Sequence, residues 1–388
     1  IFGLSVNALD LGPTASYDPD AEMRDGLQSQ SEIKAISAGV FAGDGADSID
    51  LRGDVSSRAN SAISATAIST TIEAVPTAPW SGNQVDINMI AIGRADGVIG
   101  GAGEDSISVF GDLIATSSAT SENSVSSVSV PVEMPVPLVG AAGAASVFLS
   151  AGSEASSTAR GLNGGDDADF IQYFGSNLSV SSDAASRSTL VFLDAIISLS
   201  EPPDPPLGEI PTVEYSLLAA TAESTSRADG FQGGAGNDSL LLGVGAIGNV
   251  TANATAENIA VAIEMSLDAS GSESNTTTTS LDIGGFDTQA MARSVAAGFS
   301  GGDGADILSN NGTLDVLSTA NAKSGSYRGG ARVNSDNLGF DIVRMQNMAD
   351  ARAISQGMVG GSGADRLINI GALTTDAIST ATLEDVSA

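Results

Sequence analysis

Six aspartates recur at one position of a short glycine-rich phrase, and each is followed two places later by Ile or Leu. Successive aspartates are 58, 64, 69, 68 and 59 residues apart, and a period of about 64 residues indicates one structural unit repeated along the chain. A carboxylate among glycines is a donor set suited to hard divalent cations. The candidate metal ligands are Asp47, Asp105, Asp169, Asp238, Asp306 and Asp365.

The glycines beside each aspartate complete the expected donor set, because a backbone free to curl can turn several carbonyl oxygens toward one ion. Four copies read GGxGxDxU, where U is a large apolar residue, at 100–107, 233–240, 301–308 and 360–367. Two copies depart, because Ala42 replaces a first glycine and Asp167 a third glycine. The further candidate metal-binding residues are Gly43, Gly45, Gly101, Gly103, Gly165, Asp167, Gly234, Gly236, Gly302, Gly304, Gly361 and Gly363.

This phrase resembles the nonapeptide of the RTX, or haemolysin-type, calcium-binding family of secreted bacterial proteins that form parallel β-rolls. The resemblance implies that Ca²⁺ lies between stacked turns, bound by turn carbonyls and the Asp carboxylate, while the apolar residue enters the core. It covers about a sixth of the chain. Family members run their nonapeptides in tandem, whereas each phrase here stands alone.

Isolated turns can still form metal sites, since a long coil stacks its turns at the same rise of about 4.8 Å as a short one. Six stacked turns would enclose five sites, and Ca²⁺ would relieve repulsion among six carboxylates in a partly dry row. We expect weak affinity, on the order of 0.1 to 1 mM, as in extracellular modules. The alternative, glycine turns without metal, explains the glycines but not the repeated aspartate.

The charge balance limits the possible partners. The 388-residue chain has 47 acidic and 15 basic residues, a formal net charge of −32, and neither histidine nor cysteine. Nucleic acid and anionic membrane surfaces would repel such a chain. Residue type excludes ordinary zinc, copper, haem and iron–sulfur sites, disulfides and a Ser-His-Asp triad. No apolar run approaches the roughly 18 residues of a membrane helix, so we expect no membrane insertion.

Alternation of apolar and polar residues after each turn predicts a long strand with one buried and one exposed face. Loops rich in Pro, Gly, Ser or Thr are predicted next, at 75–83, 130–140, 201–211, 269–280 and 324–336. A second alternating strand then returns to the next turn. The predicted fold class is all-β: one parallel β-solenoid over 1–388, with six coils of about 64 residues, one GGxGxD turn per coil and two facing sheets.

The same alternation of inward and outward positions places one basic residue of each return strand on the outer face, where it would relieve repulsion between acidic strands. These residues are Lys34, Arg94, Arg160, Arg227, Arg293 and Arg352. Slips of one residue near 176–177 and 243–245 predict β-bulges, after which Ile247 and Val250 would face inward. Outward apolar residues near the loops indicate lateral contacts, against ordinary scatter as the alternative; they are Ile68, Ile72, Ile90, Ile92, Val128, Val130, Phe148, Val191, Leu193, Tyr215 and Leu217.

The two ends of the sequence have the form of half coils. Residues 1–38 resemble the second half of a repeat and residues 366–388 the first half, and joining tail to head gives an interval of 70 residues. We therefore expect incomplete first and last coils that complement each other across a subunit junction, giving an open head-to-tail filament. The alternative is an excerpt of a longer repeat protein.

Three classes of function follow from these features. The favoured one is a calcium-stabilised extracellular structural protein, secreted and assembling with copies of itself into a fibre, sheath or surface layer, with possible lateral bundling. The second is a cell-surface adhesin or an ice- or glycan-binding solenoid, which would use one flat face. The third is a polysaccharide-active β-helix enzyme, but we see no candidate constellation of catalytic groups and do not expect an enzyme.

Overall fold

The computed structural model describes residues 26–75, 83–133, 146–198, 213–268, 280–333 and 345–387, and every regular element within these ranges is a β-strand. Three strands recur in each coil. The return strands are β1 (Gly26–Asp44), β4 (Asn83–Ala102), β7 (Ser146–Asp166), β10 (Val213–Ala235), β13 (Ser280–Asp303) and β16 (Met345–Ser362). Four-residue strands follow the turns: β2 (Ser48–Leu51), β5 (Ser106–Val109), β8 (Phe170–Tyr173), β11 (Ser239–Leu242), β14 (Ile307–Asn310) and β17 (Arg366–Asn369). The outgoing strands are β3 (Val55–Val75), β6 (Leu113–Glu133), β9 (Asn177–Ser198), β12 (Ile247–Asp268), β15 (Thr313–Val333) and β18 (Ala372–Ser387).

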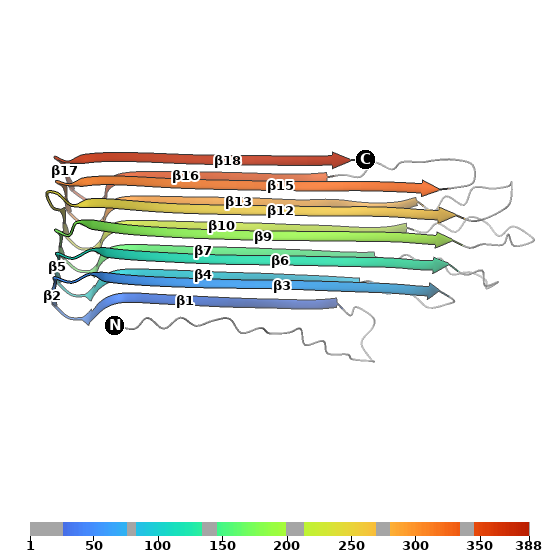
Figure 1. Ribbon diagram of the computed structural model, residues 1–388, viewed down its shortest axis with the longest axis horizontal. Helices are drawn as coiled ribbons and strands as arrows, with labels where there is room; N and C mark the ends of the chain where they lie inside the picture. The colour runs from blue at the N-terminus through green and yellow to red at the C-terminus, as the bar shows by residue number, and fades with distance from the viewer. Residues whose placement is uncertain are drawn as a thin grey trace, which may run out of the picture.

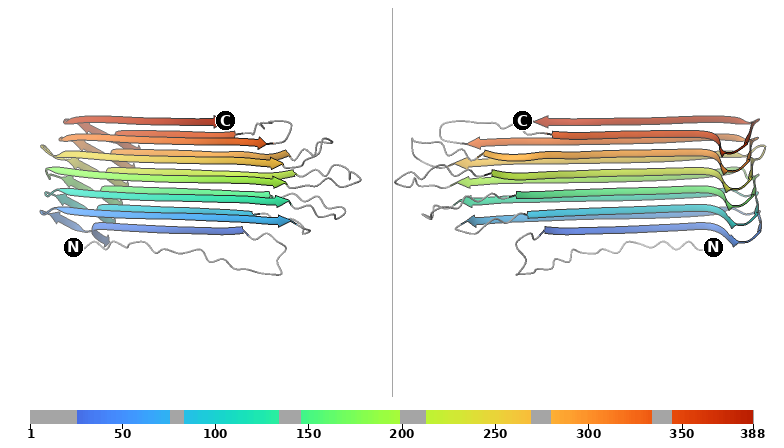
Figure 2. Two further views of the ribbon diagram at one scale, coloured as in Figure 1. Left: turned by 45° about the vertical axis from the view of Figure 1, so that its right-hand side comes forward. Right: turned by 180° about the vertical axis from the view of Figure 1, so that it is seen from behind.

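These strands form three parallel six-stranded sheets, which confirms the predicted parallel β-solenoid of six coils. Sheet A contains the return strands, sheet B the four-residue strands and sheet C the outgoing strands. Figure 1 shows the coils stacked in chain order, with the turns together at one narrow edge, and the two views of Figure 2 agree. The molecule is longest along its strands, as expected of a slab built from few long coils (Figure 1).

Sheet B is a feature that the alternation pattern did not predict. Each outgoing strand was expected to run unbroken from the turn, but it stops after four residues and turns a second corner, for example between Leu51 and Val55. The shifts in alternation at 176–177 and 243–245 lie at this corner. They are caused by extra residues in the connection between two strands, and not by the β-bulges that we predicted. The inward placement of Ile247 was wrong: its side chain is 47% exposed, while Val250 is buried.

Strand lengths otherwise follow the predicted loops, with two corrections. The loops predicted at 130–140 and 324–336 were wrong in their first parts, because β6 continues as a strand to Glu133 and β15 continues to Val333. The rest of these two loops, the centres of the other predicted loops, and residues 1–25 lie outside the described residues.

Two kinds of core lie between the sheets. Next to the turns is a turn-side core of large apolar side chains, fully buried; it includes Val98, Ile107, Leu113, Leu162, Ile171, Leu178, Phe231, Leu240, Phe299, Leu308 and Leu314. Farther along the strands is a serine band in which buried hydroxyls of sheets A and C bond to each other; it consists of Ser117, Ser121, Ser153, Ser157, Ser182, Ser186, Ser224, Ser226, Ser294 and Ser318.

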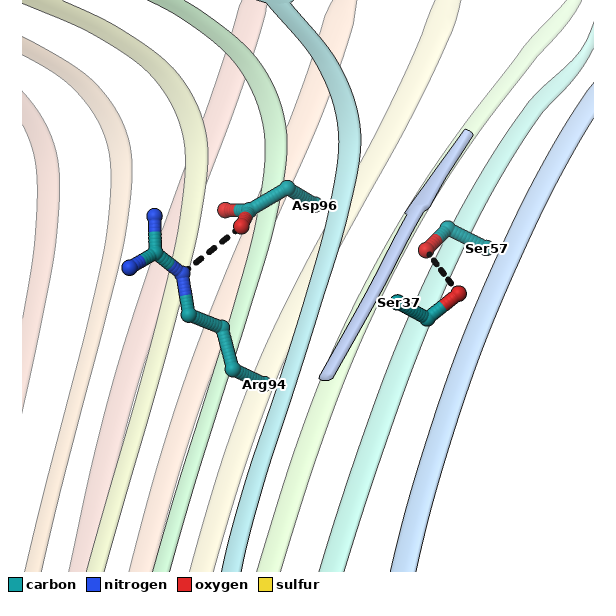
Figure 3. A network of polar contacts seen from close by, with 4 residues as sticks. All are labelled: Ser37, Ser57, Arg94 and Asp96. Atoms are coloured by element: carbon teal, nitrogen blue, oxygen red, sulfur yellow. Dashed lines mark hydrogen bonds and ion pairs between the residues drawn. The ribbon is translucent and has the colours of Figure 1, made fainter. Parts of the chain in front are cut away.

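Small side chains let sheets A and C approach closely at the serine band. A Cβ added at Gly93 of β4 would lie 2.7 Å from the carbonyl oxygen of Ser118 in β6. Figure 3 shows another close contact between these sheets, in the first coil, where Ser57 Oγ donates a hydrogen bond of 2.9 Å to Ser37 Oγ.

The outer face of sheet A carries the predicted basic residues at outward positions. Two of them pair along their own strand: Arg94 Nε lies 2.7 Å from Asp96 Oδ2, and Arg227 Nε lies 2.7 Å from Asp229 Oδ2 (Figure 3 shows the first pair). Asp96 and Asp229 are 2% and 0% exposed, so these are ion pairs with one buried partner rather than a fully solvated surface. The predicted outward apolar residues Ile90, Ile92, Val128, Val191 and Leu193 are half-buried. The side chains of the other six lie outside the described residues.

Candidate functional site

The site is the row of six glycine-rich turns that joins sheets A and B. At each turn the second and third glycine positions of the motif have positive φ angles, between 107° and 135° where the residue is glycine. Asp167, which replaces a third glycine, is the one non-glycine residue with positive φ among the described residues, at 74°. L-residues with a Cβ rarely adopt these angles, which explains why glycine recurs.

The stacking of the coils is a second reason why these positions require glycine, and the sequence did not reveal it. A Cβ added at Gly101 would collide with the carbonyl oxygen of Gly43 in the preceding coil, and the same holds at Gly165 and its successors. The backbones of neighbouring turns therefore approach closer than any side chain would permit. Part of the glycine pattern is explained by packing without a metal.

The six aspartates form a directional hydrogen-bonded ladder, and their predicted stacking in neighbouring coils is confirmed. The backbone N–H of Asp47 donates to Oδ1 of Asp105 at 2.8 Å, and the N–H of Asp105 donates to Oδ1 of Asp169 at 2.9 Å. The ladder continues through Asp238 and Asp306 to Asp365 at 2.8 to 3.0 Å. One oxygen of each aspartate beyond the first thus satisfies a backbone donor of the neighbouring coil, which is a structural role for the repeated aspartate.

The second carboxylate oxygen is unpartnered. Oδ2 of each of the first five aspartates is buried and has no hydrogen-bond partner among the described residues. The carboxylates of Asp105, Asp169, Asp238 and Asp306 are at most 2% exposed. In coils two to six Oδ2 lies so near the first glycine of its own turn that a Cβ there would collide with it, as at Gly100. A buried carboxylate oxygen without a donor is costly, so each turn retains capacity for a cation or a proton.

Electrostatics support this interpretation. Burial raises the pKa of Asp169 to about 7, with repulsion from Asp238, Asp105 and Asp167 adding to the effect. Burial likewise raises the pKa of Asp238 to about 6, and it raises the pKa of Asp306. The hydrogen bond that each of these carboxylates accepts from a backbone N–H opposes the rise. Negative charge is therefore disfavoured in the row unless a counter-charge enters it.

The donor set fits calcium in kind. It offers carboxylate and backbone carbonyl oxygens only, which are the ligands of hard divalent cations. Within the described ranges no three acidic side chains converge on one point, so a bound ion would depend on turn carbonyls for most of its ligands. More acids are exposed at the tips of the turns, at Asp44, Glu104, Asp166 and Asp303.

A second corner, between sheets B and C, carries polar groups that sequence reasoning missed. Asp54 and Asp112 accept backbone N–H groups from the following coil at 3.0 Å, and Ser176 Oγ donates to Asp112 at 2.6 Å. Burial, together with Asp112, raises the pKa of the adjacent Tyr173. Only the first two coils have an aspartate here, so no six-fold pattern marked the corner.

Comparisons with protein-family models, curated proteins and solved structures found no match to this chain. Within the described ranges there is no helix with the length and apolar character needed to cross a membrane.

Proposed function

We propose that this chain is a calcium-stabilised extracellular structural protein whose coils extend end to end into a filament. The observation that carries the proposal is the row of five buried, unpartnered carboxylate oxygens, one per turn and each in a neighbouring coil. A cation between successive turns would supply the counter-charge that this row lacks, in a chain of net charge −32.

The chemistry and the resemblance to the RTX family agree on calcium. When bound, the ion would neutralise the carboxylates of two neighbouring turns and accept their carbonyls as ligands. Asp105, Asp169, Asp238 and Asp306 would hold it, and the positive-φ glycines would keep side chains out of the space between turns. Weak, millimolar-range affinity suits an extracellular location, where such calcium-binding modules work.

Calcium binding is tested by thermal unfolding of the full chain with calcium, with magnesium and with a chelator. Calcium at ten times its Kd would add about 1.4 kcal/mol per site to the free energy of unfolding. Asp238→Asn removes one carboxylate of the row, and Asp315→Asn removes an exposed carboxylate of β15 as a matched control. We expect calcium to raise the Tm of the native chain and of D315N, and to raise that of D238N by less. If the chelator leaves the Tm unchanged, the proposal that a bound metal stabilises the fold is refuted.

Assembly is supported by the two end coils. Sheets A, B and C each end in an edge strand at both ends of the stack. Within the described residues, each edge strand has a neighbour on one side only. An inward apolar side chain is exposed there: Leu367 of the last coil is 49% exposed, whereas its counterparts in the four internal coils are fully buried. Open parallel edges are templates for a further coil. Sedimentation velocity and negative-stain microscopy of the full chain, with and without calcium, test whether filaments form.

A second candidate, a glycan-binding solenoid, is favoured by one feature of sheet A. Its outer face has a shallow polar pocket of about 370 Å³ over β1, β4, β7 and β10. The lining is amide, hydroxyl and carboxylate groups, from Gln28, Gln30, Asp86, Asn88, Ser150 and Thr221. Such groups bond sugar hydroxyls. Binding of soluble oligosaccharides to the native chain, lost in N88A, would favour this function.

A further inference from the structure

We propose that the sixth coil of one copy pairs with the first coil of the next in the register of the internal coils, so that Asp47 of the next copy stacks on Asp365. This inference rests on the proposed end-to-end assembly and specifies its polarity and contacts. Three independent features of the end coils carry it.

The first feature is the direction of the aspartate ladder. In every internal step the backbone N–H of one aspartate donates to Oδ1 of the aspartate in the following coil. At the ends, the described part of the chain has no further aspartate of this ladder to accept the N–H of Asp365 or to donate to Oδ1 of Asp47. The free donor at one end matches the free acceptor at the other. Two like ends brought together would not match, so the contact is heterologous and has one polarity.

The second feature is the turn-side core, which is cut open at both ends. Val98, Ile107 and Leu113 of the second coil, and Phe299, Leu308 and Leu314 of the fifth, are fully buried. Their counterparts in the end coils are only partly buried, and Leu367 is 49% exposed. In the internal register Met358, Leu367 and Leu373 would cover Val40, Ile49 and Val55 of the next copy. The junction would then bury the same columns that are buried inside the stack.

The third feature is the glycine at the open face of the first turn. A Cβ at Gly101, Gly165, Gly234, Gly302 or Gly361 would collide with a carbonyl of the preceding coil. Gly43 holds the same position and a φ of 115°, but a Cβ there would meet no atom of the described residues within 4 Å. A preceding coil contributed by another copy would bring the Gly361 carbonyl against Gly43. The turn at Asp47 therefore has room for a neighbouring turn, and the space between Asp365 and Asp47 would become a further inter-turn site that neither copy forms alone.

Cysteine cross-linking tests the register, since the chain has no cysteine of its own. Ser56 of β3 and Thr374 of β18 are exposed and occupy one column on the outer face of sheet C. Within a copy they are separated by five coil rises, about 24 Å, which a disulfide cannot span. Across an in-register junction their Cα atoms would be about 4.8 Å apart, within disulfide range. Asp376 lies two residues farther along β18, so S56C/D376C is the out-of-register control.

Mild oxidation of full-length S56C/T374C in calcium should give a ladder of covalent oligomers, whereas S56C/D376C should remain largely uncross-linked. Sedimentation of the cysteine-free chain distinguishes a wrong register from a failure to assemble. If copies assemble but the S56C/T374C pair does not cross-link, or the control pair cross-links better, the register is wrong and the assembly stands. If the native chain does not assemble, the proposed filament fails and this inference with it.

Gly43→Ala gives an independent test. Inside one copy the added methyl has free space, so the variant should keep its fold and lose stability only through its positive φ, by the amount seen in the control Gly245→Ala. Across the junction the methyl would meet a backbone carbonyl. We expect G43A to lower the association constant at least tenfold while G245A associates as the native chain does. Equal association of G43A, G245A and the native chain would overturn the proposed register.

Discussion

The turn-side core and the serine band hold the same two sheets together in different ways. Next to the turns, large side chains stack in columns from coil to coil; Phe231 and Phe299, for example, lie with ring centroids 4.5 Å apart and planes at 11°. In the serine band, hydroxyls alternate between the sheets, with Ser157 Oγ 2.9 Å from both Ser117 and Ser182. The first region is stabilised mainly by burial of apolar area, and the second by satisfied hydrogen bonds between closely spaced sheets.

The difference shows what each part of the coil requires. The turn has to bring six carboxylates into a row, and a wide apolar core beneath it fixes the backbone that presents them. The serine band has no comparable site, and small side chains there suffice to keep long strands flat and close. We therefore expect substitutions at the turn to affect the whole stack and substitutions in the band to act locally.

The largest effect is expected at a glycine of the turn. In Gly234→Ala the Cβ would collide with the carbonyl of Gly165 at a φ of 119°. Strain at the residue and overpacking against the backbone together should cost about 4–6 kcal/mol. Chemical denaturation measures this cost, with Gly245→Ala as control because it has positive φ but free space. Similar losses of unfolding free energy in the two variants would mean that contact with the neighbouring coil is not what requires glycine at position 234.

The next largest effect is expected in the turn-side core. Phe299→Ala removes a fully buried ring that stacks on Phe231 and should cost about 3–5 kcal/mol. Phe170→Ala removes a ring that is 43% exposed on sheet B and should cost less than about 1 kcal/mol. The free energies of unfolding of the two variants can be compared directly. A small loss for F299A would contradict the assignment of stability to this core.

The aspartate row should give the metal-free chain an unusual pH dependence. The folded-state pKa values of about 7 for Asp169 and about 6 for Asp238 lie above the unfolded value of 3.8. The folded state then binds protons more tightly, so this contribution raises stability as pH falls from about 8 to about 5, by at most about 1.4 kcal/mol per pH unit for each group. Tm in chelator measures it, and D169N/D238N should flatten the profile. A profile unchanged in the double variant would contradict the assignment.

The smallest effect is expected in the serine band. Ser182→Ala removes a hydroxyl that is bonded to Ser157 and Ser226 at 2.9 Å each, and should cost about 1–2 kcal/mol. Ser179→Ala, on the outer face of the same strand, should change stability by less than about 0.5 kcal/mol. Amide hydrogen exchange would show whether the S182A loss is confined to neighbouring strands. Protection lost equally in the turns would contradict the local role of the band.

Much of the fold was predictable because one signal repeats six times. The spacing of the aspartates gave the coil, and the period-two alternation gave the long strands and their buried faces. The second corner was not predictable, because alternation survives it in the first coil: Leu51 and Val55 keep the parity of Ile49 although the strand is broken between them. Ile247 was misplaced for the related reason that an insertion at the corner can reset the parity.

The candidate site divides in the same way. The sequence by itself determined which residues stand at each turn, that the ligands are oxygen atoms, and that six equivalent turns occur. Only the tertiary structure decided how each aspartate is used, with Oδ1 bonded to the preceding coil and Oδ2 buried without a partner. It also decided why the glycines cannot be replaced, since the obstacle at Gly101 is a carbonyl 58 residues away in the chain. Such contacts depend on which backbones the stacking brings together, and a local pattern of residue types carries no record of them.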